Sequence, residues 1–220
     1  MKKKQEINLD LYSPLKTLTL EAKGKKRLTI LIAGFGYNFD MPIFYYTNKL
    51  LDSKETDVLF IDFGYSQYDG FLKLSEEEQE AIFAKDLAII EEYVESLQYE
   101  QFLFIGKSLG TTACYKLLHS QDIYDKTIGV VWLSPGTSAY KISKFIAKND
   151  LNNLLIYGEN DKYHEQLNLQ LLEQNSINLT HIPISNADHI LESENCVESI
   201  NILKFVIEKI NIFVNKLFIS

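Results

Sequence analysis

The chain has 220 residues, of which 46% are hydrophobic and 24% are charged, and its formal net charge is −8. These values are typical of a globular protein, and we expect a single domain over residues 1–220. The negative charge argues against nucleic-acid binding, which relies on clustered Lys and Arg side chains. The sequence contains no run of 18 apolar residues that would predict a membrane span, and the polar segment 1–13 does not resemble a secretory signal.

The two cysteines, Cys114 and Cys196, are too few for a disulfide framework. Cys114 lies in an apolar helical pattern and is interpreted as a small core residue. The cysteine usage therefore predicts a reduced, cytoplasmic protein.

Apolar runs and amphipathic segments alternate along the chain. Continuous apolar runs such as Leu28–Ala33 are typical of strands that are buried on both faces of a sheet. We expect strands at residues 15–21, 28–33, 57–62, 101–105, 128–133, 151–157 and 178–184. We expect helices at residues 42–51, 76–97, 109–119, 139–147, 163–173 and 194–217.

Two of these helices have further features. Ser75 and Glu78 have the Ser-x-x-Glu spacing of a capping box, which predicts where the helix 76–97 begins. The last helix is very apolar but carries a polar stripe at helical spacing, formed by Asn201, Lys204, Glu208, Asn211 and Asn215. We therefore expect its apolar side to pack on the sheet, with a homodimer contact as the less favoured alternative.

The alternation of strands and helices predicts an α/β fold. Its sheet should be mostly parallel, with seven to eight strands and helices on both faces. Ligands of such sheets bind outside the carboxyl ends of the strands. Functional residues are therefore expected directly after strands.

The segment Gly106-Lys107-Ser108-Leu109-Gly110 matches the pattern Gly-x-Ser-x-Gly between a predicted strand and a predicted helix. In this context the pattern exposes a nucleophilic serine at a sharp turn, and the small flanking residues leave room for it. The helix N-terminus that follows favours developing negative charge. Gly-Lys-Ser also ends a phosphate-binding loop, but that loop requires a glycine where Gln101 stands. We interpret Ser108 as a nucleophile.

A serine nucleophile needs a general base, and the base needs a third group that orients it. His189 is the best candidate base, because it lies in a polar loop directly after the strand 178–184. The other histidines are His119 late in a helix, His181 inside a strand and His164 one turn into a helix. We expect none of these three to act as the base.

The preferred acid is Asp161, which follows the strand 151–157 at the same edge of the sheet. Glu159 is the local competitor. Asp188 is adjacent to His189 in the sequence, which makes an approach to the far ring nitrogen awkward. The resulting order Ser, Asp, His is the chain order of Gly-x-Ser-x-Gly enzymes with an α/β fold.

Two backbone N–H groups are expected to bind an oxyanion, those of Leu109 and Phe35. Leu109 follows the nucleophile, and Phe35 lies in the glycine-containing loop after the strand 28–33. Five aromatic residues in loops at the same edge are candidates for lining a substrate pocket: Phe35, Tyr37, Tyr65, Tyr68 and Tyr163. The alternative that they are ordinary surface residues is weighted equally.

Five segments together resemble the α/β-hydrolase superfamily over nearly the whole chain: AGFG, FIDFGY, FLFIGKSLG, IYGENDKY and NADHIL. The resemblance implies a nucleophile, a base, an acid and two oxyanion donors, namely Ser108, His189, Asp161, Phe35 and Leu109. The chain departs from the family at Ala33-Gly34, where His-Gly is common, and at Lys107, where an aromatic residue or His is common. Fewer than twenty residues separate Leu133 from Leu151, so the resemblance implies a fold without a cap domain and with an open cleft.

The predicted activity is hydrolysis of a small carboxylic ester or thioester through an acyl-enzyme. The predicted partner is a small-molecule acyl substrate, with no cofactor, metal ion, nucleic acid or membrane. Two alternatives remain open, a peptidase or amidase that uses the same residues and a non-catalytic binding protein that keeps the fold.

Overall fold

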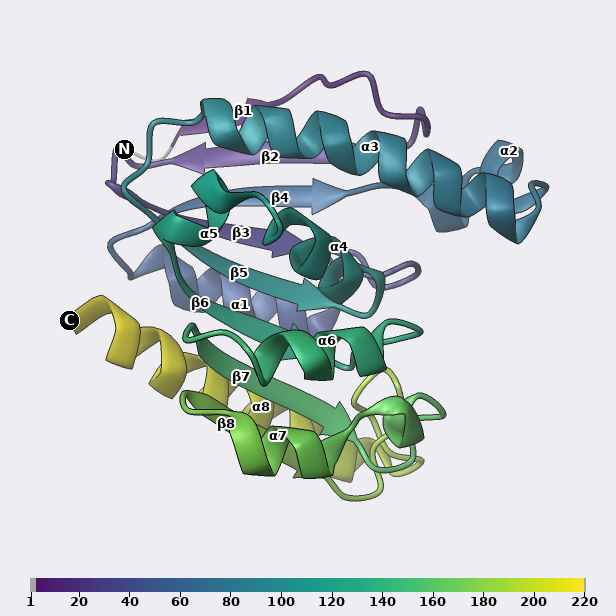
Figure 1. Ribbon diagram of the computed structural model, residues 1–220, viewed down its shortest axis with the longest axis vertical. Coiled ribbons are helices and arrows are strands. Elements are labelled where there is room, and N and C mark those ends of the chain that lie inside the picture. Colours follow the sequence, from purple (N-terminus) through teal and green to yellow (C-terminus); the bar gives the residue numbers. More distant parts are fainter. Residues whose placement is uncertain (1–2, 220) are drawn as a thin grey trace.

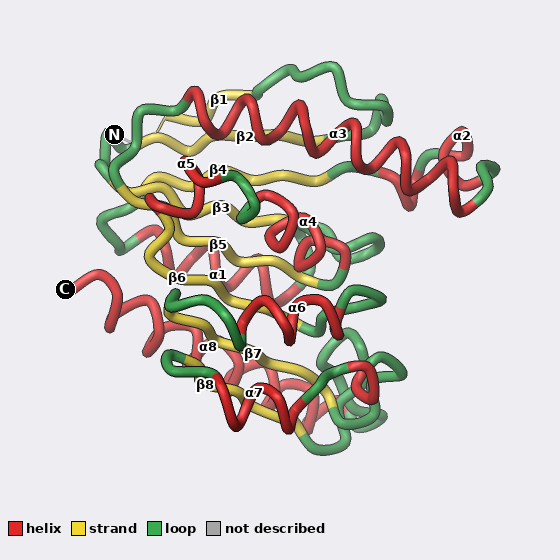
Figure 2. The backbone as a smooth tube through the Cα atoms, viewed as in Figure 1, coloured by secondary structure: helices red, strands yellow, loops and turns green. Residues whose placement is uncertain are grey.

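The computed structural model describes residues 3–219, which form one eight-stranded sheet with helices on both faces (Figures 1 and 2). The strand order is β1-β2-β4-β3-β5-β6-β7-β8. The strands are β1 (Lys3–Glu6), β2 (Thr17–Ala22), β3 (Arg27–Ile32), β4 (Asp57–Asp62), β5 (Gln101–Lys107), β6 (Thr127–Leu133), β7 (Asn152–Gly158) and β8 (Leu179–Ile184). The six strands from β4 to β8 in this order are parallel, and β1 and β2 extend the sheet in antiparallel pairing.

Seven α-helices and two short 3₁₀ helices lie between the described strands, and an eighth α-helix follows the last strand. The α-helices are α1 (Pro42–Asp52), α2 (Asp69–Leu72), α3 (Glu76–Ser96), α4 (Leu109–Leu117), α5 (Gln121–Lys126), α6 (Ala139–Ile146), α7 (Leu169–Asn175) and α8 (Cys196–Ile219). The 3₁₀ helices are η1 (Tyr65–Gln67) and η2 (His164–Gln166). Helices α1 and α8 cover one face of the sheet, and α3 to α7 cover the other (Figure 1).

The two faces bury separate apolar clusters, because successive side chains of a strand point to opposite faces. In β3, Leu28, Ile30 and Ile32 pack under α3 and α4, whereas Leu31 packs under α1 and α8. All four side chains are fully buried. This explains why the parallel strands appear in the sequence as continuous apolar runs.

The predicted strands and most predicted helices are confirmed within a few residues. Ser75 forms the predicted capping box, in which its Oγ accepts from Glu78 N–H at 3.3 Å and the Glu78 carboxylate accepts from Ser75 N–H at 2.8 Å. The predicted helix 163–173 is wrong as one element: η2 and α7 are separate, and the side chain of Asn168 caps α7 by accepting from Leu171 N–H. The sequence pattern also missed β1, η1, α2 and α5.

Helix α8 packs on the sheet as predicted, with Val206, Ile210 and Val214 fully buried. Val197, Ile200 and Ile212 remain exposed on it, and the homodimer stays a prediction. Between residues 3 and 219, no helix combines the length and the apolar character that a membrane crossing requires. Both cysteines are free thiols, Cys114 buried and Cys196 exposed.

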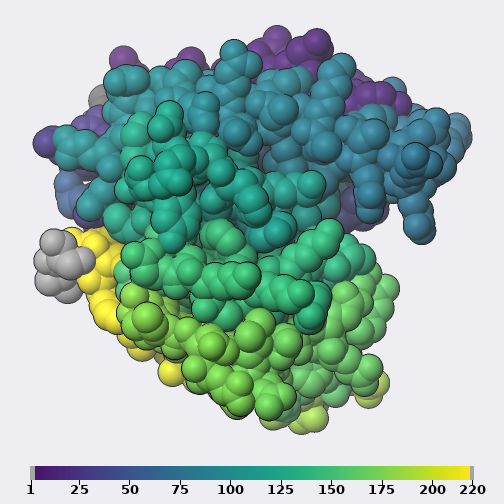
Figure 3. Space-filling model, viewed as in Figure 1, coloured from purple at the N-terminus to yellow at the C-terminus, as the bar shows by residue number. Residues whose placement is uncertain are grey.

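One segment between β4 and the middle of α3 extends beyond the carboxyl edge of the sheet. It contains η1, α2 and the first turns of α3, and it stands out from the body of the molecule in the ribbon and space-filling views (Figures 1 and 3). By contrast, the connection between β6 and β7, which the resemblance implies to be too short for a cap domain, contains only α6.

Candidate active site

Ser108 lies in the turn between β5 and α4, at the carboxyl edge of the sheet. Its φ of 52° and ψ of −112° place a non-glycine residue in a region that is sterically costly. The flanking glycines permit this turn, because a Cβ at Gly106 would lie 2.5 Å from the Gly110 carbonyl oxygen. A Cβ at Gly110 would lie 2.1 Å from the carbonyl oxygen of Ile32. We call residues 106–110 the serine turn.

His189 lies in the segment after β8, residues 185–192, which we call the histidine turn. Two residues of this turn, Asn186 and Leu191, have positive φ values of 61° and 65°. The Asp188 carboxylate accepts from the backbone N–H groups of Ile190 at 2.9 Å and Glu192 at 3.1 Å. Asp188 therefore shapes the turn from within and does not contact the imidazole.

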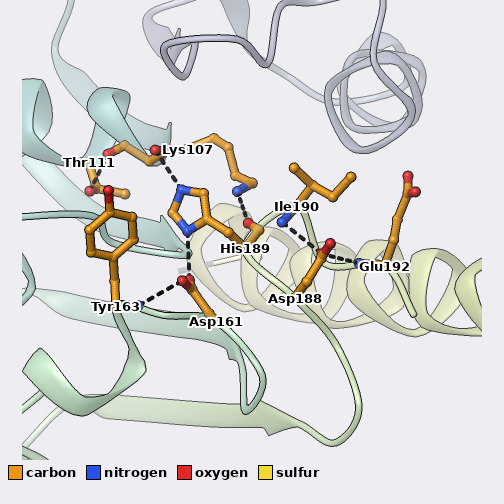
Figure 4. A network of polar contacts seen from close by, with 9 residues as sticks. Lys107, Thr111, Asp161, Tyr163, Asp188, His189, Ile190 and Glu192 are labelled. Carbon is orange, nitrogen blue, oxygen red and sulfur yellow. Dashed lines mark hydrogen bonds and ion pairs between the residues drawn. The ribbon is translucent and has the colours of Figure 1, made fainter. Parts of the chain in front are cut away.

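The His189 ring lies between Ser108 and Asp161. Figure 4 shows the ring beside the Asp161 carboxylate. The distance from Nε2 to Ser108 Oγ is 2.8 Å, and the distance from Nδ1 to Asp161 Oδ2 is 2.6 Å. These three residues come from the ends of β5, β7 and β8, so the parallel sheet brings together positions that are 81 and 28 residues apart.

Asp161 is buried, with 5% of its surface exposed, and it is held by two donors. Its Oδ1 accepts from Tyr163 N–H at 2.9 Å, and its Oδ2 contacts His189. Burial raises the pKa of the carboxyl, but the hydrogen bonds from His189 and Tyr163 N–H outweigh it, and the net pKa is lowered. Asp161 is therefore suited to remain charged and to orient the ring of His189.

The competing acid and bases lie elsewhere. Glu159 accepts from the hydroxyl of Ser185 at 2.7 Å. His119 is exposed, and its Nδ1 lies within hydrogen-bond distance of the Tyr115 carbonyl oxygen. The ring of His164 stacks on that of Tyr157. His181 lies within β8.

The two candidate oxyanion donors belong to residues that line one pocket together with Ser108. Leu109 is the first residue of α4, where the N–H has no partner within the helix. Gly34 approaches the serine turn closely, since a Cβ there would lie 3.3 Å from Ser108 Cβ. In the described part of the chain, neither Phe35 N–H nor Leu109 N–H donates to a protein acceptor. Both are thus available to a substrate oxygen.

Ser108 opens into a cleft of about 460 Å³ between the serine turn and the projecting segment. Its lining includes five aromatic side chains and two glutamates. The lining residues are Phe35, Tyr65, Phe71, Glu76, Gln79, Glu80, Phe83, Ser108, Leu109, Thr112, Gly136, Thr137 and Tyr163.

Three of the predicted pocket residues, Phe35, Tyr65 and Tyr163, line this cleft. Tyr37 does not, because its loop turns the ring toward α1, where the hydroxyl accepts from Ile43 N–H at 3.1 Å. Tyr68 also lies outside the lining and packs near Tyr12, with ring centroids 5.7 Å apart.

The wall formed by α2 and α3 was missed by sequence reasoning. Tyr65 and Phe71 stack at 4.0 Å between ring centroids, and the Tyr65 hydroxyl donates to the buried Asp86 of α3 at 2.5 Å. Asp86 also accepts from Tyr12 N–H, so the N-terminal segment supports the wall. The available signal was the density of aromatic residues between positions 63 and 83, which has no helical or strand period.

Solved structures of other proteins match the architecture of this chain over nearly its whole length. Dienelactone hydrolase from Anabaena variabilis matches over 94% of this chain and 96% of its own, with a TM-score of 0.63 and 16% identity. The fold is that of the α/β-hydrolases. Alpha/beta hydrolase domain-containing protein 10 from mouse matches over 98% and 99% (TM-score 0.64, 11% identity). Est1E from Butyrivibrio proteoclasticus, solved with ferulic acid bound, matches over 94% and 99% (TM-score 0.60, 14% identity).

No family model and no curated protein sequence matches the chain. Among the described residues, no group of three or more His, Cys, Asp or Glu side chains is arranged to hold a metal ion. The α/β-hydrolase fold of this chain thus rests on its architecture alone.

Proposed function

We propose that the protein is a serine hydrolase that cleaves carboxylic esters or thioesters through an acyl-enzyme. The observation that carries this proposal is the position of the His189 ring, within hydrogen-bond distance of both Ser108 Oγ and Asp161 Oδ2. This arrangement of nucleophile, base and orienting acid activates a hydroxyl that is otherwise a weak nucleophile.

In the proposed reaction, Ser108 Oγ attacks the carbonyl carbon while His189 Nε2 takes the hydroxyl proton. The oxyanion is bound by the N–H groups of Phe35 and Leu109. When the carbonyl re-forms, the bond to the alcohol or thiol breaks, and His189 returns the proton to that leaving group. A water molecule, deprotonated by His189, then attacks the acyl carbon. The bond to Ser108 Oγ breaks, His189 returns the proton to Oγ, and the acid is released.

The cleft supports an apolar, preferably aromatic, acyl or alcohol group as the substrate part. The rings of Tyr65, Phe71 and Phe83 provide flat apolar surface beside Ser108. Glu76 and Glu80 carry negative charge into the same cleft, which disfavours substrates that bear a carboxylate or phosphate. Because one solved structure with the same fold holds ferulic acid, esters of aromatic acids are the first to test.

The test is hydrolysis of p-nitrophenyl and naphthyl esters with acyl groups of increasing length. We expect activity in the wild type, its loss in Ser108→Ala, and no change in Ser53→Ala, an exposed serine at the C-terminus of α1. If the wild type hydrolyses none of the esters, or if Ser108→Ala is equally active, the proposed function is wrong.

The charge of the cleft allows a second comparison. Neutral aromatic esters should be better substrates than matched esters with a carboxylate on the acyl group. In the variant Glu76→Gln/Glu80→Gln, this preference is expected to shrink roughly threefold to tenfold, because the repulsion acts across a solvent-exposed opening. An unchanged preference would show that these glutamates do not contact the bound acyl group.

A further inference from the structure

Lys107, the residue before the candidate nucleophile, is completely buried, with 0% of its surface exposed. Removing an ammonium group from water is costly unless other groups compensate for it. Burial lowers the pKa of Lys107 to about 7, although the carboxylates of Asp161 and Asp188 act in the opposite direction. A lysine in such a position needs an explanation that the proposed acyl transfer does not yet provide.

The contacts of the Lys107 amino group connect it to two loops of the site. Its Nζ donates to the backbone carbonyl oxygen of His189, and Figure 4 shows the amino group directed at the main chain of this residue. On its other side, Nζ lies 5.3 Å from the centre of the Tyr37 ring. Tyr37 belongs to the loop of the candidate oxyanion donor, where its carbonyl oxygen accepts from Gly34 N–H.

We propose that Lys107 is a positioning residue that holds the histidine turn, and thereby the His189 ring, against Ser108 and Asp161. This inference rests on the proposed hydrolase function. Lys107 does not line the cleft at Ser108, so it acts on a substrate only through His189. Strained residues, Asn186 and Leu191, lie on either side of His189, and the hydrogen bond from Lys107 adds to those that hold the turn from within.

The charged and titratable groups around Lys107 come from three elements. Asp161 lies in the turn after β7, Asp188 lies in the histidine turn, and Tyr37 lies in the loop after β3. The pKa of Tyr37 is raised to about 12, mainly by burial, and the negative charge of Glu192 also contributes to this rise. The nearby carboxylates favour the charged form of Lys107, which is the form that donates the stronger hydrogen bond to a carbonyl oxygen.

The first experiment compares Lys107→Met with Lys126→Met on an ester that the wild type hydrolyses. Methionine has a similar length but no donor, and Lys126 lies over Phe102 at the opposite edge of the sheet. We expect kcat of Lys107→Met to fall roughly 10- to 100-fold, because a small displacement of a general base is costly. KM should change less than about twofold, because Lys107 does not contact the cleft. Lys126→Met should retain the wild-type kcat.

Thermal unfolding separates positioning from a general loss of structure. The Tm of Lys107→Met is expected to equal or exceed that of the wild type, since the variant avoids burying an ammonium group. A loss of activity that follows a matching loss of folded protein at the assay temperature would overturn the proposal. So would a kcat within about twofold of the wild type.

A double-variant cycle tests whether Lys107 acts through His189. On a His189→Ala background, Lys107→Met should change the residual rate by less than about twofold, because the group that it positions is gone. The same fold-loss on both backgrounds would overturn the proposal. A wild type without Ser108-dependent activity would instead refute the proposed function, and the two failures are thus distinguishable.

Discussion

The serine turn and the histidine turn both hold residues in strained backbone conformations, but different forces hold them. In the serine turn, Ser108 is fixed by close packing of backbone atoms around Gly106 and Gly110. In the histidine turn, Asn186 and Leu191 are accompanied by polar contacts made by Asp188 and Lys107. Disturbing the close packing should destabilise the whole fold. Removing a polar contact should instead let the turn move while the sheet stays folded. Variants of the two turns should therefore differ in what they lose.

The largest loss of kcat is expected for the residue whose side chain contacts the His189 imidazole, Asp161. Asp161→Asn should lower kcat roughly 10⁴-fold at neutral pH, because an amide no longer holds the ring with its proton on Nδ1. Glu159→Gln is the matched control, since Glu159 contacts Ser185 and should leave kcat unchanged. Steady-state kinetics on one ester measure both variants. Equal losses in the two variants would contradict the assignment of Asp161.

The next effect concerns stability in the serine turn. Gly110→Ala should lower the free energy of unfolding by about 3 kcal/mol or more, because the new methyl group meets the backbone of β3, which has no room to shift. Gly36→Ala is the control, since a Cβ at Gly36 meets no atom within 4 Å. Urea unfolding measures the difference. If both variants are equally stable, close packing does not hold this turn.

A smaller effect is expected inside the histidine turn. Asp188→Ala removes the acceptor of two backbone N–H groups and should lower kcat about tenfold, with a stability loss of roughly 1–2 kcal/mol. Asp188→Asn keeps an oxygen that accepts both bonds and should stay close to the wild type. The ratio of kcat between the two variants is the decisive quantity. Identical kcat values would show that these bonds do not hold His189.

A further effect, on stability alone, is a dependence of the free energy of unfolding on pH. The folded-state pKa of Lys107 is lowered to about 7, below its ordinary value of 10.5. Between these values the unfolded chain binds more protons at this residue, so its contribution to stability rises with pH and is least favourable below pH 7. Relative to Lys107→Met, the wild type should gain free energy of unfolding from pH 7 to pH 10. Urea unfolding at several pH values measures this, and parallel curves would contradict the burial of a titrating amine.

The sequence was sufficient for the parts of the site that depend on local patterns. Ser108 directly follows a strand, Asp161 and His189 lie in the loops after two others, and parallel strands bring such positions to one edge. The candidate oxyanion loop followed from the same rule. β1 was missed because its residues Lys3–Glu6 are all exposed, and it joins the sheet through backbone pairing with β2.

Features that depend on contacts between distant segments were not predictable in this way. The aromatic wall of the cleft depends on the packing of η1 and α2 against α3, and neither short element has a hydrophobic period. The burial of Lys107 was not predictable, because its partner, the carbonyl oxygen of His189, lies 82 residues further along the chain. The direction of the Tyr37 ring was decided by the backbone of α1.

Labelling with a fluorophosphonate tests most directly whether Ser108 is a nucleophile that His189 activates. Mass spectrometry of the wild type should find one adduct on the peptide that contains Ser108, none in Ser108→Ala, and much slower labelling in His189→Ala. An unlabelled wild type, or an adduct of the same mass in Ser108→Ala, would contradict the account.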